Sequence, residues 1–400
     1  MTYFYTWQAQ RGARGLDLRG GHGVWMETDA GEVLDLGALV YQANAGHGHR
    51  RIVDAIKAQA DRLCLAAPSS DYPEKRALAQ ALLEKAPDGF STVFFCLGGS
   101  DANENALKIA RLHTGRYKAV ARYRSYHGAT LGAVSLTGDW RRVPVEPALP
   151  GVVHVMDLED DRPTDIPRTL ELEGEVGAVF LESVPGANGV VIPRVQDMRA
   201  IREACTKHGA LLVMDEVLVG FGRTGKYFAF EHFGVTPDLI TCGKAITAGY
   251  GVLGAVLVHE RVARSFDDRI LACGLTHYAH PLGVAAALEA MRVYDDEKLV
   301  ENAETLGPRL AAGLSALPEP VVGTRSLGLL GAADLALDAA SLKMLDAALR
   351  REKVFVHVKS HGQTRRDTAM LVVSPPLCIS ADELDEGLAR IARALASLSR

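Results

Sequence analysis

The middle of the chain alternates short apolar runs with amphipathic helical patterns. Runs such as "VGAVF" and "ALLVM" are continuously apolar, which is typical of strands that are covered on both faces of a sheet. Segment 195–209 has apolar residues at helical spacing and predicts a covering helix. The predicted strands are 92–96, 118–123, 176–182, 210–216, 238–242 and 252–259. We therefore expect an α/β domain with a mostly parallel sheet, and a solvated loop at 156–174, which is rich in acid and proline.

The two ends of the chain show a different pattern. Residues 16–36 alternate around a turn at 29–31, which predicts a small antiparallel hairpin. Towards the C-terminus, helical patterns at 281–294, 298–317, 339–351 and 381–398 interleave with short strands near 321–336, 353–358 and 369–373. We expect the two termini to combine into one smaller α+β domain. The predicted division is 1–45 and 286–400 for the smaller domain and 46–285 for the large one.

Composition and charge narrow the class of protein. A chain of 400 residues exceeds the size at which one core keeps growing, so two packed units are expected. With 48% hydrophobic and 23% charged residues, it has the composition of an ordinary globular protein. A net charge of -5 gives no electrostatic reason to expect nucleic acid or an anionic membrane as a partner. Small molecules are the expected partners.

The sequence carries no targeting signal that we recognise. Its N-terminal stretch lacks an apolar core followed by a small-residue cleavage site, and no run of about 18 apolar residues occurs. The six cysteines are scattered without a Cys-x-x-Cys pair, so a disulfide scaffold is not expected. We predict a cytoplasmic protein with no membrane partner and no metal site.

Lys244 is the one formally charged residue between Asp238 and Glu260, in a stretch of small, apolar and glycine residues. Burial disfavours an ammonium ion and lowers the pKa, which is what a lysine needs to attack an aldehyde as a neutral amine. The alternative is a surface lysine with a solvated head, and the lack of neighbouring charge argues against it.

Asp215 and Glu216 follow the apolar run "ALLVM", at the carboxyl end of a predicted strand. Ligands of open α/β sheets bind at this edge. A carboxylate there needs a cation or a protonated ring nitrogen as its partner, because an unpaired buried charge is costly. A salt bridge at the strand end is the alternative.

Two further motifs follow predicted strands. Gly98-Gly99-Ser100 precedes an amphipathic helix, whose free backbone N–H groups and dipole favour a phosphate; alternatively, Ser100 is only an N-cap. Tyr126, in the loop after 118–123, could stack on a planar ring or belong to the core. A phosphate site, a stacking aromatic, an acid for a ring nitrogen and a reactive lysine together predict pyridoxal 5′-phosphate as the cofactor.

The order and spacing of several motifs resemble the class III (ω-type) aminotransferases, a family of fold-type I pyridoxal-phosphate enzymes. These motifs are "LGGSDANENALKIAR", "YRSYHGAT", "ESVPGANGVVIP", "LLVMDEVLVGFGRTG", "PDLITCGKAITAGYGVLGAVL", "LTHYAHPLGVAAAL" and "SPPLCIS", and the resemblance covers about residues 17–395. The resemblance implies a large domain with a mostly parallel seven-stranded central sheet, and a smaller α+β domain built from both termini.

The resemblance also implies roles for individual residues. Lys244 would hold the cofactor as an imine, and Asp215 would pair with the pyridine nitrogen. Tyr126 and Val217 would pack on the two faces of the ring. Thr276 would reach the phosphate of the neighbouring subunit, so a homodimer with shared active sites is expected. The full set of cofactor-binding residues expected from the resemblance is Gly99, Ser100, Tyr126, His127, Asp215, Val217, Lys244 and Thr276.

The implied reaction is the transfer of an amino group from an amine to an oxo acid by a ping-pong mechanism. Donors of the taurine, β-alanine or 4-aminobutyrate type, and pyruvate or 2-oxoglutarate as the acceptor, are expected. Members acting on ornithine or 4-aminobutyrate carry a glutamate where this chain has Ala187, so Ala187 favours the enzymes that use β-alanine, taurine or simple amines. A racemase, aminomutase or lyase on the same scaffold is the alternative.

The substrate pocket is expected to contain Tyr41 and Trp7. In the resembling enzymes an arginine about ten residues before the "PPL" segment binds the substrate carboxylate. This chain has His357 at that position, and Arg365 or Arg366 are displaced candidates. How the acid group of a substrate is held is therefore an open question at the level of the sequence.

Overall fold

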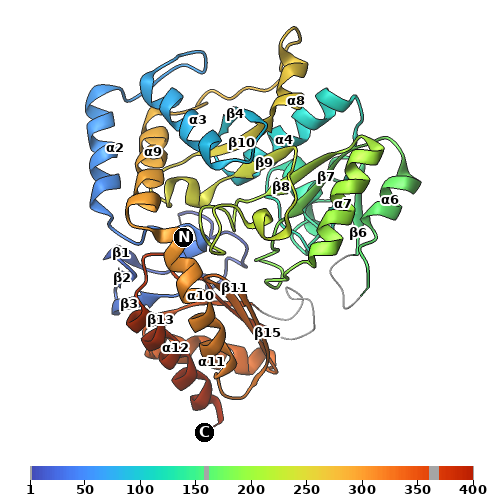
Figure 1. The fold of residues 1–400 in the computed structure, drawn as a ribbon. Helices are drawn as coiled ribbons and strands as arrows, with labels where there is room; N and C mark the ends of the chain where they lie inside the picture. The colour runs from blue at the N-terminus through green and yellow to red at the C-terminus, as the bar shows by residue number, and fades with distance from the viewer. Residues whose placement is uncertain (1, 157–161, 360–368, 400) are drawn as a thin grey trace.

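A seven-stranded sheet crosses the centre of the molecule in the computed structural model, which describes residues 2–156, 162–359 and 369–399. Its strands are β4 (Phe90–Cys96), β5 (Lys118–Arg122), β6 (Val152–Val155), β7 (Val176–Glu182), β8 (Leu211–Asp215), β9 (Leu239–Cys242) and β10 (Gly254–His259). The strand order is β4-β10-β9-β8-β7-β5-β6 (Figure 1). Only β10 runs antiparallel to its neighbours. The predicted α/β fold with a mostly parallel sheet is confirmed.

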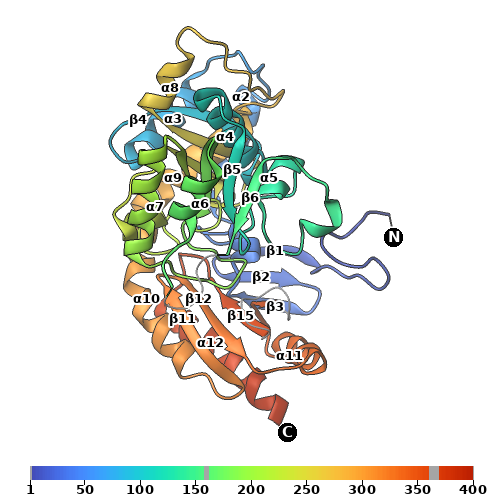
Figure 2. The ribbon, with the colours of Figure 1, turned by 90° about the vertical axis from the view of Figure 1, so that its right-hand side faces the viewer.

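Both faces of this sheet are covered by helices, which explains the continuously apolar strands. Val213 of β8 belongs to the apolar cluster that contains helix α4 (Gly99–Thr114), whereas its neighbours Leu212 and Met214 pack with helix α7 (Val195–His208). This alternation is the two-residue period of a strand. Figure 2 shows α7 on one side of the sheet and helix α5 (Leu131–Leu136) on the other.

The remaining helices of the central part are α2 (Arg50–Arg62), α3 (Pro73–Lys85), α6 (Ile166–Glu173), α8 (Glu260–Ala263) and α9 (Pro281–Asp296). Helix α6 corrects the loop predicted at 156–174. Its Ile166 and Leu170, four residues apart, are buried in the interior, and α6 packs on α7. Strand β6 was also not predicted. Both elements are short. Acidic residues and prolines surround the two buried positions of α6, so its sequence shows no clear helical pattern of apolar residues.

The two termini meet in a small sheet. Strands β1 (Leu18–His22), β2 (Trp25–Thr28) and β3 (Gly31–Asp35) form an antiparallel meander, and β13 (Val354–Phe355) joins β3 in parallel. A third sheet has the order β11-β12-β15-β14, with β11 (Val321–Leu327), β12 (Leu330–Leu335), β14 (His357–Lys359) and β15 (Ala369–Val373). Helices α10 (Leu299–Ser315), α11 (Ala339–Arg351) and α12 (Ala381–Ala396) accompany it. The domain boundaries at residues 45 and 285 stay a prediction.

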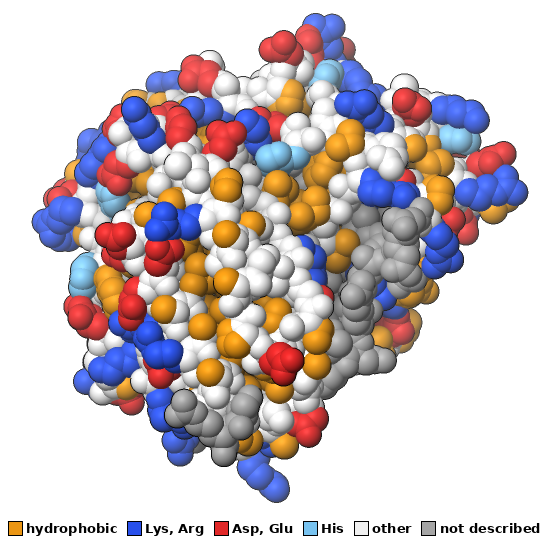
Figure 3. Space-filling model, turned by 60° about the horizontal axis from the view of Figure 1, so that its bottom comes forward, with side chains coloured by type: hydrophobic (Ala, Val, Ile, Leu, Met, Phe, Trp, Pro, Cys, Tyr) orange, Lys and Arg blue, Asp and Glu red, His pale blue; other side chains and the backbone are white. Residues whose placement is uncertain are grey.

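The surface charge and the helix composition of the described residues give no indication of a nucleic-acid or membrane partner. Figure 3 shows side chains of both charge signs next to one another around the rim of one face, with apolar and uncharged side chains in most of its middle. The described part of this face therefore has no large area of one charge sign. Within the described ranges, no helix has the length and apolar content needed to span a bilayer.

Candidate active site

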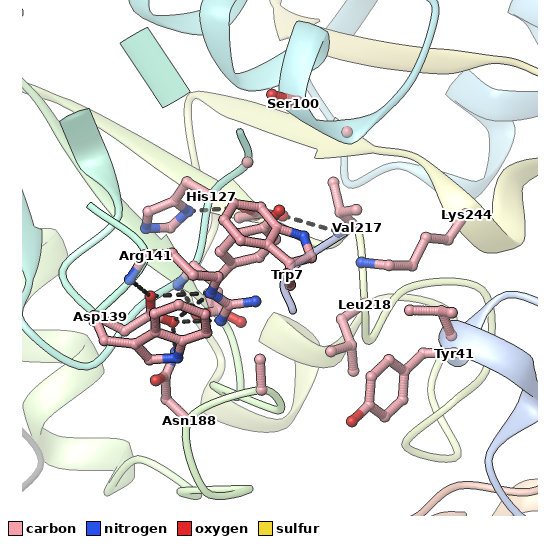
Figure 4. A pocket seen from close by; sticks show the side chains of 18 of the residues that line it. Trp7, Tyr41, Ser100, His127, Asp139, Arg141, Asn188, Val217, Leu218 and Lys244 are labelled. Carbon is pink, nitrogen blue, oxygen red and sulfur yellow. Dashed lines mark hydrogen bonds and ion pairs between the residues drawn. The ribbon is translucent and has the colours of Figure 1, made fainter. Parts of the chain in front are cut away.

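A cavity of about 410 Å³ lies at the carboxyl edge of the central sheet (Figure 4). The loops that follow β4, β5, β7, β8 and β9 all contribute to its wall, as expected for an open α/β sheet. Seven of the eight residues predicted to bind the cofactor line it, namely Gly99, Ser100, Tyr126, His127, Asp215, Val217 and Lys244. Trp7 and Tyr41, predicted for the substrate pocket, also line it. Residues far apart in the sequence are thus brought together around one space.

Lys244 begins the short 3-10 helix η3 (Lys244–Thr247), directly after β9. Its φ of 43° is unusual for a residue with a side chain and costs on the order of 1 kcal/mol, a strain that is often found at functional sites. Its amine extends into the cavity (Figure 4). Nζ makes no hydrogen bond or ion pair with any described residue. Burial lowers the pKa of Lys244, although the carboxylates of Asp215 and Glu182 act in the opposite direction. Burial therefore makes this amine easier to deprotonate than an ordinary lysine.

Asp215 is fixed by a set of hydrogen bonds at the end of β8. Its Oδ2 accepts from Nδ2 of Asn103 at 2.7 Å and from Nδ1 of His127 at 2.8 Å, and its Oδ1 accepts from the backbone N–H of Val217 at 3.0 Å. Oδ1 of Asn103 accepts in turn from the hydroxyl of Thr241 at 2.8 Å. These partners hold the carboxylate on the cavity wall. Among the described residues they include no lysine or arginine, and His127 is the partner that a salt bridge at the strand end would have.

Glu216 points away from the cavity, on the other side of the strand end. Its carboxylate accepts hydrogen bonds from the backbone N–H groups of Ala229 and Phe230, at 2.9 and 3.0 Å, and from the hydroxyl of Ser183. Burial raises the pKa of Glu216 to about 7. The two neighbouring acids therefore have different surroundings: Asp215 faces the cavity and Glu216 ties a turn to the core.

The N-terminus of α4 meets the loop after β5 at the cavity wall. The N-cap of α4 is Gly98 and not Ser100, so the N-cap alternative for Ser100 is wrong. The Ser100 hydroxyl accepts from the backbone N–H groups of Ala129 and Thr130, at 3.1 and 3.0 Å. A Cβ atom on Gly99 would collide with the side chain of Val217. The first backbone N–H groups of an α-helix have no partner within the helix. At the N-terminus of α4 they lie beside the cavity, which suits a phosphate.

A cluster of aromatic side chains surrounds Arg141 on the opposite side of the cavity from Lys244 (Figure 4). Its guanidinium carbon lies 3.7 Å from the centre of the Tyr126 ring, 5.7 Å from that of Trp7 and 6.0 Å from that of Trp140. Nε of Arg141 lies 3.0 and 3.1 Å from the two carboxylate oxygens of Asp139. Cation–π contacts and the ion pair together fix this side chain.

The comparisons with known proteins assign the family. The sequence matches the family "Aminotransferase class-III" over residues 9–395. The chain belongs to the class III aminotransferases. An acetylornithine aminotransferase from Methanopyrus kandleri is 36% identical over 378 residues, which cover 93% of this chain and 92% of that protein.

Two solved structures of class III aminotransferase relatives superpose on nearly the whole chain. One is taurine:2-oxoglutarate aminotransferase from Bifidobacterium kashiwanohense in complex with pyridoxal phosphate and glutamate, with a TM-score of 0.91, 33% identity and coverage of 98% of this chain and 95% of the other. The second is an (S)-enantioselective ω-transaminase from Thermomicrobium roseum, with a TM-score of 0.91, 31% identity and coverage of 100% and 97%. The predicted fold-type I family is confirmed.

This class III aminotransferase uses pyridoxal phosphate and acts on amine and oxo-acid substrates, as its family does. The cavity fits that cofactor on its own geometry. Lys244 offers an amine without a partner among the described residues, and Asp215 presents a hydrogen-bonded carboxylate. The helix N-terminus beside Ser100 offers the anion site.

Two of the residues predicted for the aminotransferase site, His357 and Thr276, do not line this cavity. His357 lies behind Tyr41, with ring centres 4.5 Å apart, and its Nε2 donates to the Gly37 carbonyl at 3.1 Å. His357 does not line the cavity. Burial lowers its pKa to about 4, so its ring is neutral at pH 7. Thr276 is exposed and outside this cavity. Arg366, like Arg365, lies outside the described residues.

Several wall residues of the aminotransferase cavity were not predicted from the sequence, among them Asp139, Trp140, Arg141, Glu182 and Lys359. Glu182 had the same signal as Asp215, since it is a carboxylate at the end of a continuously buried strand. It accepts a hydrogen bond from the backbone N–H of Tyr126 at 2.9 Å, and burial raises its pKa to about 7.

Proposed function

We propose that this enzyme transfers the amino group of an ω-amino acid or simple amine, of the taurine, β-alanine or 4-aminobutyrate type, to pyruvate or 2-oxoglutarate in a ping-pong reaction. The observation that carries the proposal is the Lys244 amine, which has no partner among the described residues and shares a cavity with Asp215. Similarity to taurine:2-oxoglutarate aminotransferase and to an ω-transaminase supports the donor class. The relatives named above are aminotransferases, which favours transamination over a racemase, aminomutase or lyase.

The wall near Ala187 supports β-alanine, taurine and simple amines within this donor class, and not 4-aminobutyrate. Ala187 lines the cavity at the position where the ornithine-type enzymes carry a glutamate. A methyl group there offers no carboxylate to bind a second amino group or to pair with an arginine. A donor with one amino group and one acid group, or with an uncharged tail, fits this wall better than a diamino acid.

The chemistry divides between the cofactor and the chain. Bound pyridoxal phosphate supplies an aldehyde for the amine and a ring that accepts electrons when a proton leaves the neighbouring carbon. Lys244 would hold the cofactor covalently through its Nζ. When free, the same Nζ would be the base that takes the proton from the donor carbon during transamination. Its lowered pKa suits both tasks.

The other residues orient the ring. Asp215 would keep a proton on the ring nitrogen, and His127 positions Asp215 through its 2.8 Å hydrogen bond. Tyr126 and Val217 would pack against the ring. Gly99 and Ser100 would bind the phosphate at the N-terminus of α4, where the helix dipole favours negative charge.

The active site is completed in a homodimer. Thr276 is exposed and lies outside the cavity of its own chain, so its hydroxyl is available to the phosphate in the neighbouring subunit. Light scattering of the purified enzyme tests this part: a dimer or a larger even assembly is expected, and a monomer that retains full activity would contradict it.

A panel of donors and acceptors tests the function. Taurine, β-alanine, 4-aminobutyrate, ornithine and 1-phenylethylamine are each paired with pyruvate and with 2-oxoglutarate. We expect the highest kcat/KM with a monoamino donor, and parallel double-reciprocal plots, which are the sign of a ping-pong mechanism. A preference for ornithine over every other donor would contradict the proposed donor class.

A further inference from the structure

Some charged side chains on the cavity wall have a partner of opposite charge or a hydrogen-bond partner, and others do not. Asp215 and Glu182 accept hydrogen bonds from neutral or backbone donors and from His127, and Asp139 is paired with Arg141. Among the described residues, that leaves two cationic groups facing the cavity without an acid partner, Lys244 and Lys359. Lys244 is engaged by the cofactor under the proposed function. Lys359 has no such role.

Lys359 is the last residue of β14 and reaches the cavity from the C-terminal part of the chain. Among the residues that the structure describes, its Nζ has no hydrogen-bond or ion-pair partner. Burial and the nearby charges of Arg141 and Lys244 lower its pKa to about 8, while Asp139 acts in the opposite direction. A half-buried ammonium with cationic neighbours gains most from an added anion.

Arg141 supplies a second donor on the same wall. Asp139 takes the Nε and Nη2 edge of its guanidinium. Nη1 has no acceptor in the described part of the chain. The ring of Tyr126 and the ion pair with Asp139 hold the guanidinium in one orientation, and Asp139 is itself fixed by Nδ2 of Asn188 at 3.3 Å. A guanidinium fixed in this way loses little entropy when it binds an acid group.

We propose that Arg141 and Lys359 bind the acid group of the substrates, a carboxylate or a sulfonate, on the side of the cavity that faces Lys244. The inference rests on the proposed function and deepens it, because it names the part of the donor that is recognised. Figure 4 shows Arg141 and Lys244 entering the cavity from opposite sides, so a donor can present its amine to one and its acid group to the other. In a ping-pong reaction both substrates use this cavity in turn, so the acceptor's acid group binds there too.

This assignment answers the question that the sequence left open. His357 cannot serve as the anion partner, because it is neutral at pH 7 and lies behind Tyr41. The phosphate site at Gly99 and Ser100 belongs to the cofactor. Trp7 and Trp140 beside Arg141 present apolar surface, so an uncharged donor can still enter and the acid group determines preference.

Equilibrium binding of non-reacting acids tests the inference. Ethanesulfonate and propionate correspond to taurine and β-alanine without the amine, and their Kd for the pyridoxal-phosphate-loaded enzyme is measured by calorimetry. We expect Lys359→Met and Arg141→Met each to raise both Kd values at least tenfold. Arg142→Met and Lys353→Met are matched controls, because neither residue lines the cavity, and they should change Kd less than twofold.

A second variant guards against misfolding. Arg141→Met leaves the buried carboxylate of Asp139 without its ion pair, whereas Lys359→Met breaks no hydrogen bond or ion pair among the described residues. Arg141→Lys keeps a charge for Asp139 but loses the guanidinium geometry, so it should fold and still weaken ethanesulfonate binding severalfold. Circular dichroism and cofactor absorbance establish that each variant is folded and loaded.

Kinetics give an independent readout of the same inference. The ratio of kcat/KM for β-alanine to that for 1-propylamine should fall at least tenfold in Lys359→Met and severalfold in Arg141→Lys. Unchanged Kd values and an unchanged ratio in both variants would overturn the inference, and so would a loss of acid binding in Arg366→Met alone. If no donor converts the cofactor but ethanesulfonate binding still depends on Arg141 and Lys359, the proposed function fails and the binding site stands.

Discussion

The two ends of the cavity are built from different kinds of structure. At the cofactor end, Gly99, Asp215 and Lys244 lie at or within three residues of the end of a strand of one sheet, and hydrogen bonds fix the carboxylate. At the substrate end, Trp7 and Lys359 come from opposite ends of the chain. The same sheet edge can therefore hold one cofactor rigidly, while segments that vary independently of it decide which substrate is accepted.

Replacement of Lys244 should have the largest effect. Lys244→Ala removes both the covalent attachment and the base, so we expect kcat to fall by roughly a thousandfold or more. The absorbance of the lysine–cofactor adduct should disappear at the same time. Lys226→Ala is the matched control, since that exposed lysine pairs with Glu304 outside the cavity. A Lys244→Ala enzyme with normal turnover would refute the assignment.

Asp215 and Glu216 are neighbours in the sequence, but we expect the first to serve catalysis and the second to serve stability. Asp215→Asn should lower kcat by roughly a hundredfold, because an amide cannot keep a proton on the ring nitrogen. Glu216→Gln should leave kcat close to that of the wild type but lower the free energy of unfolding by about 1–3 kcal/mol, since an amide NH₂ would oppose a buried backbone N–H. Steady-state rates and urea unfolding measure the two effects. A normal kcat in Asp215→Asn together with a strongly reduced kcat in Glu216→Gln would contradict these roles.

A pH series tests the substrate end. With a pKa of about 8, Lys359 is mostly charged at pH 7 and mostly neutral at pH 9. The affinity for ethanesulfonate, whose own charge does not change in this range, should therefore fall as the pH rises, by roughly tenfold between these values. Arg141 and Lys244 lower this pKa and Asp139 raises it. Lys359→Met should abolish the change, and an unaltered pH profile in that variant would rule out Lys359 as its source.

The smallest expected effect concerns the contact between subunits. Thr276→Ala removes one hydroxyl from the proposed phosphate site of the partner, which is worth about 1 kcal/mol, or roughly a fivefold loss in cofactor affinity. Titration of the apoenzyme with pyridoxal phosphate measures it, and the dimer should persist by light scattering. An unchanged affinity would exclude Thr276 from the site.

The cofactor end could be predicted from the sequence because each of its residues belongs to a local pattern. Lys244 follows an apolar strand in a neutral stretch, and Ser100 stands where a strand passes into a helix. Most strands of the central sheet were predicted for the same reason. Strand β6 and helix α6 were missed, because a four-residue strand and a helix of eight residues carry too short a periodic pattern.

The substrate end could not be predicted in this way. Arg141 and Arg142 are adjacent and chemically identical, yet Arg141 lines the cavity and Arg142 pairs with Glu146. His357 and Lys359 are two residues apart and so lie on the same face of β14. The side chain of His357 stops behind Tyr41, whereas that of Lys359 reaches the cavity. Tertiary packing, which no local pattern encodes, decides between the members of each pair.

The most direct test of the central claim is a single half-reaction. Enzyme loaded with pyridoxal phosphate is mixed with taurine or β-alanine in the absence of any oxo acid, and the absorbance is followed. We expect the aldehyde form of the cofactor to convert stoichiometrically to the pyridoxamine form, with release of one equivalent of carbonyl product and no conversion in Lys244→Ala. A cofactor that stays in the aldehyde form with every donor, or that racemises a donor without forming pyridoxamine phosphate, would contradict the account.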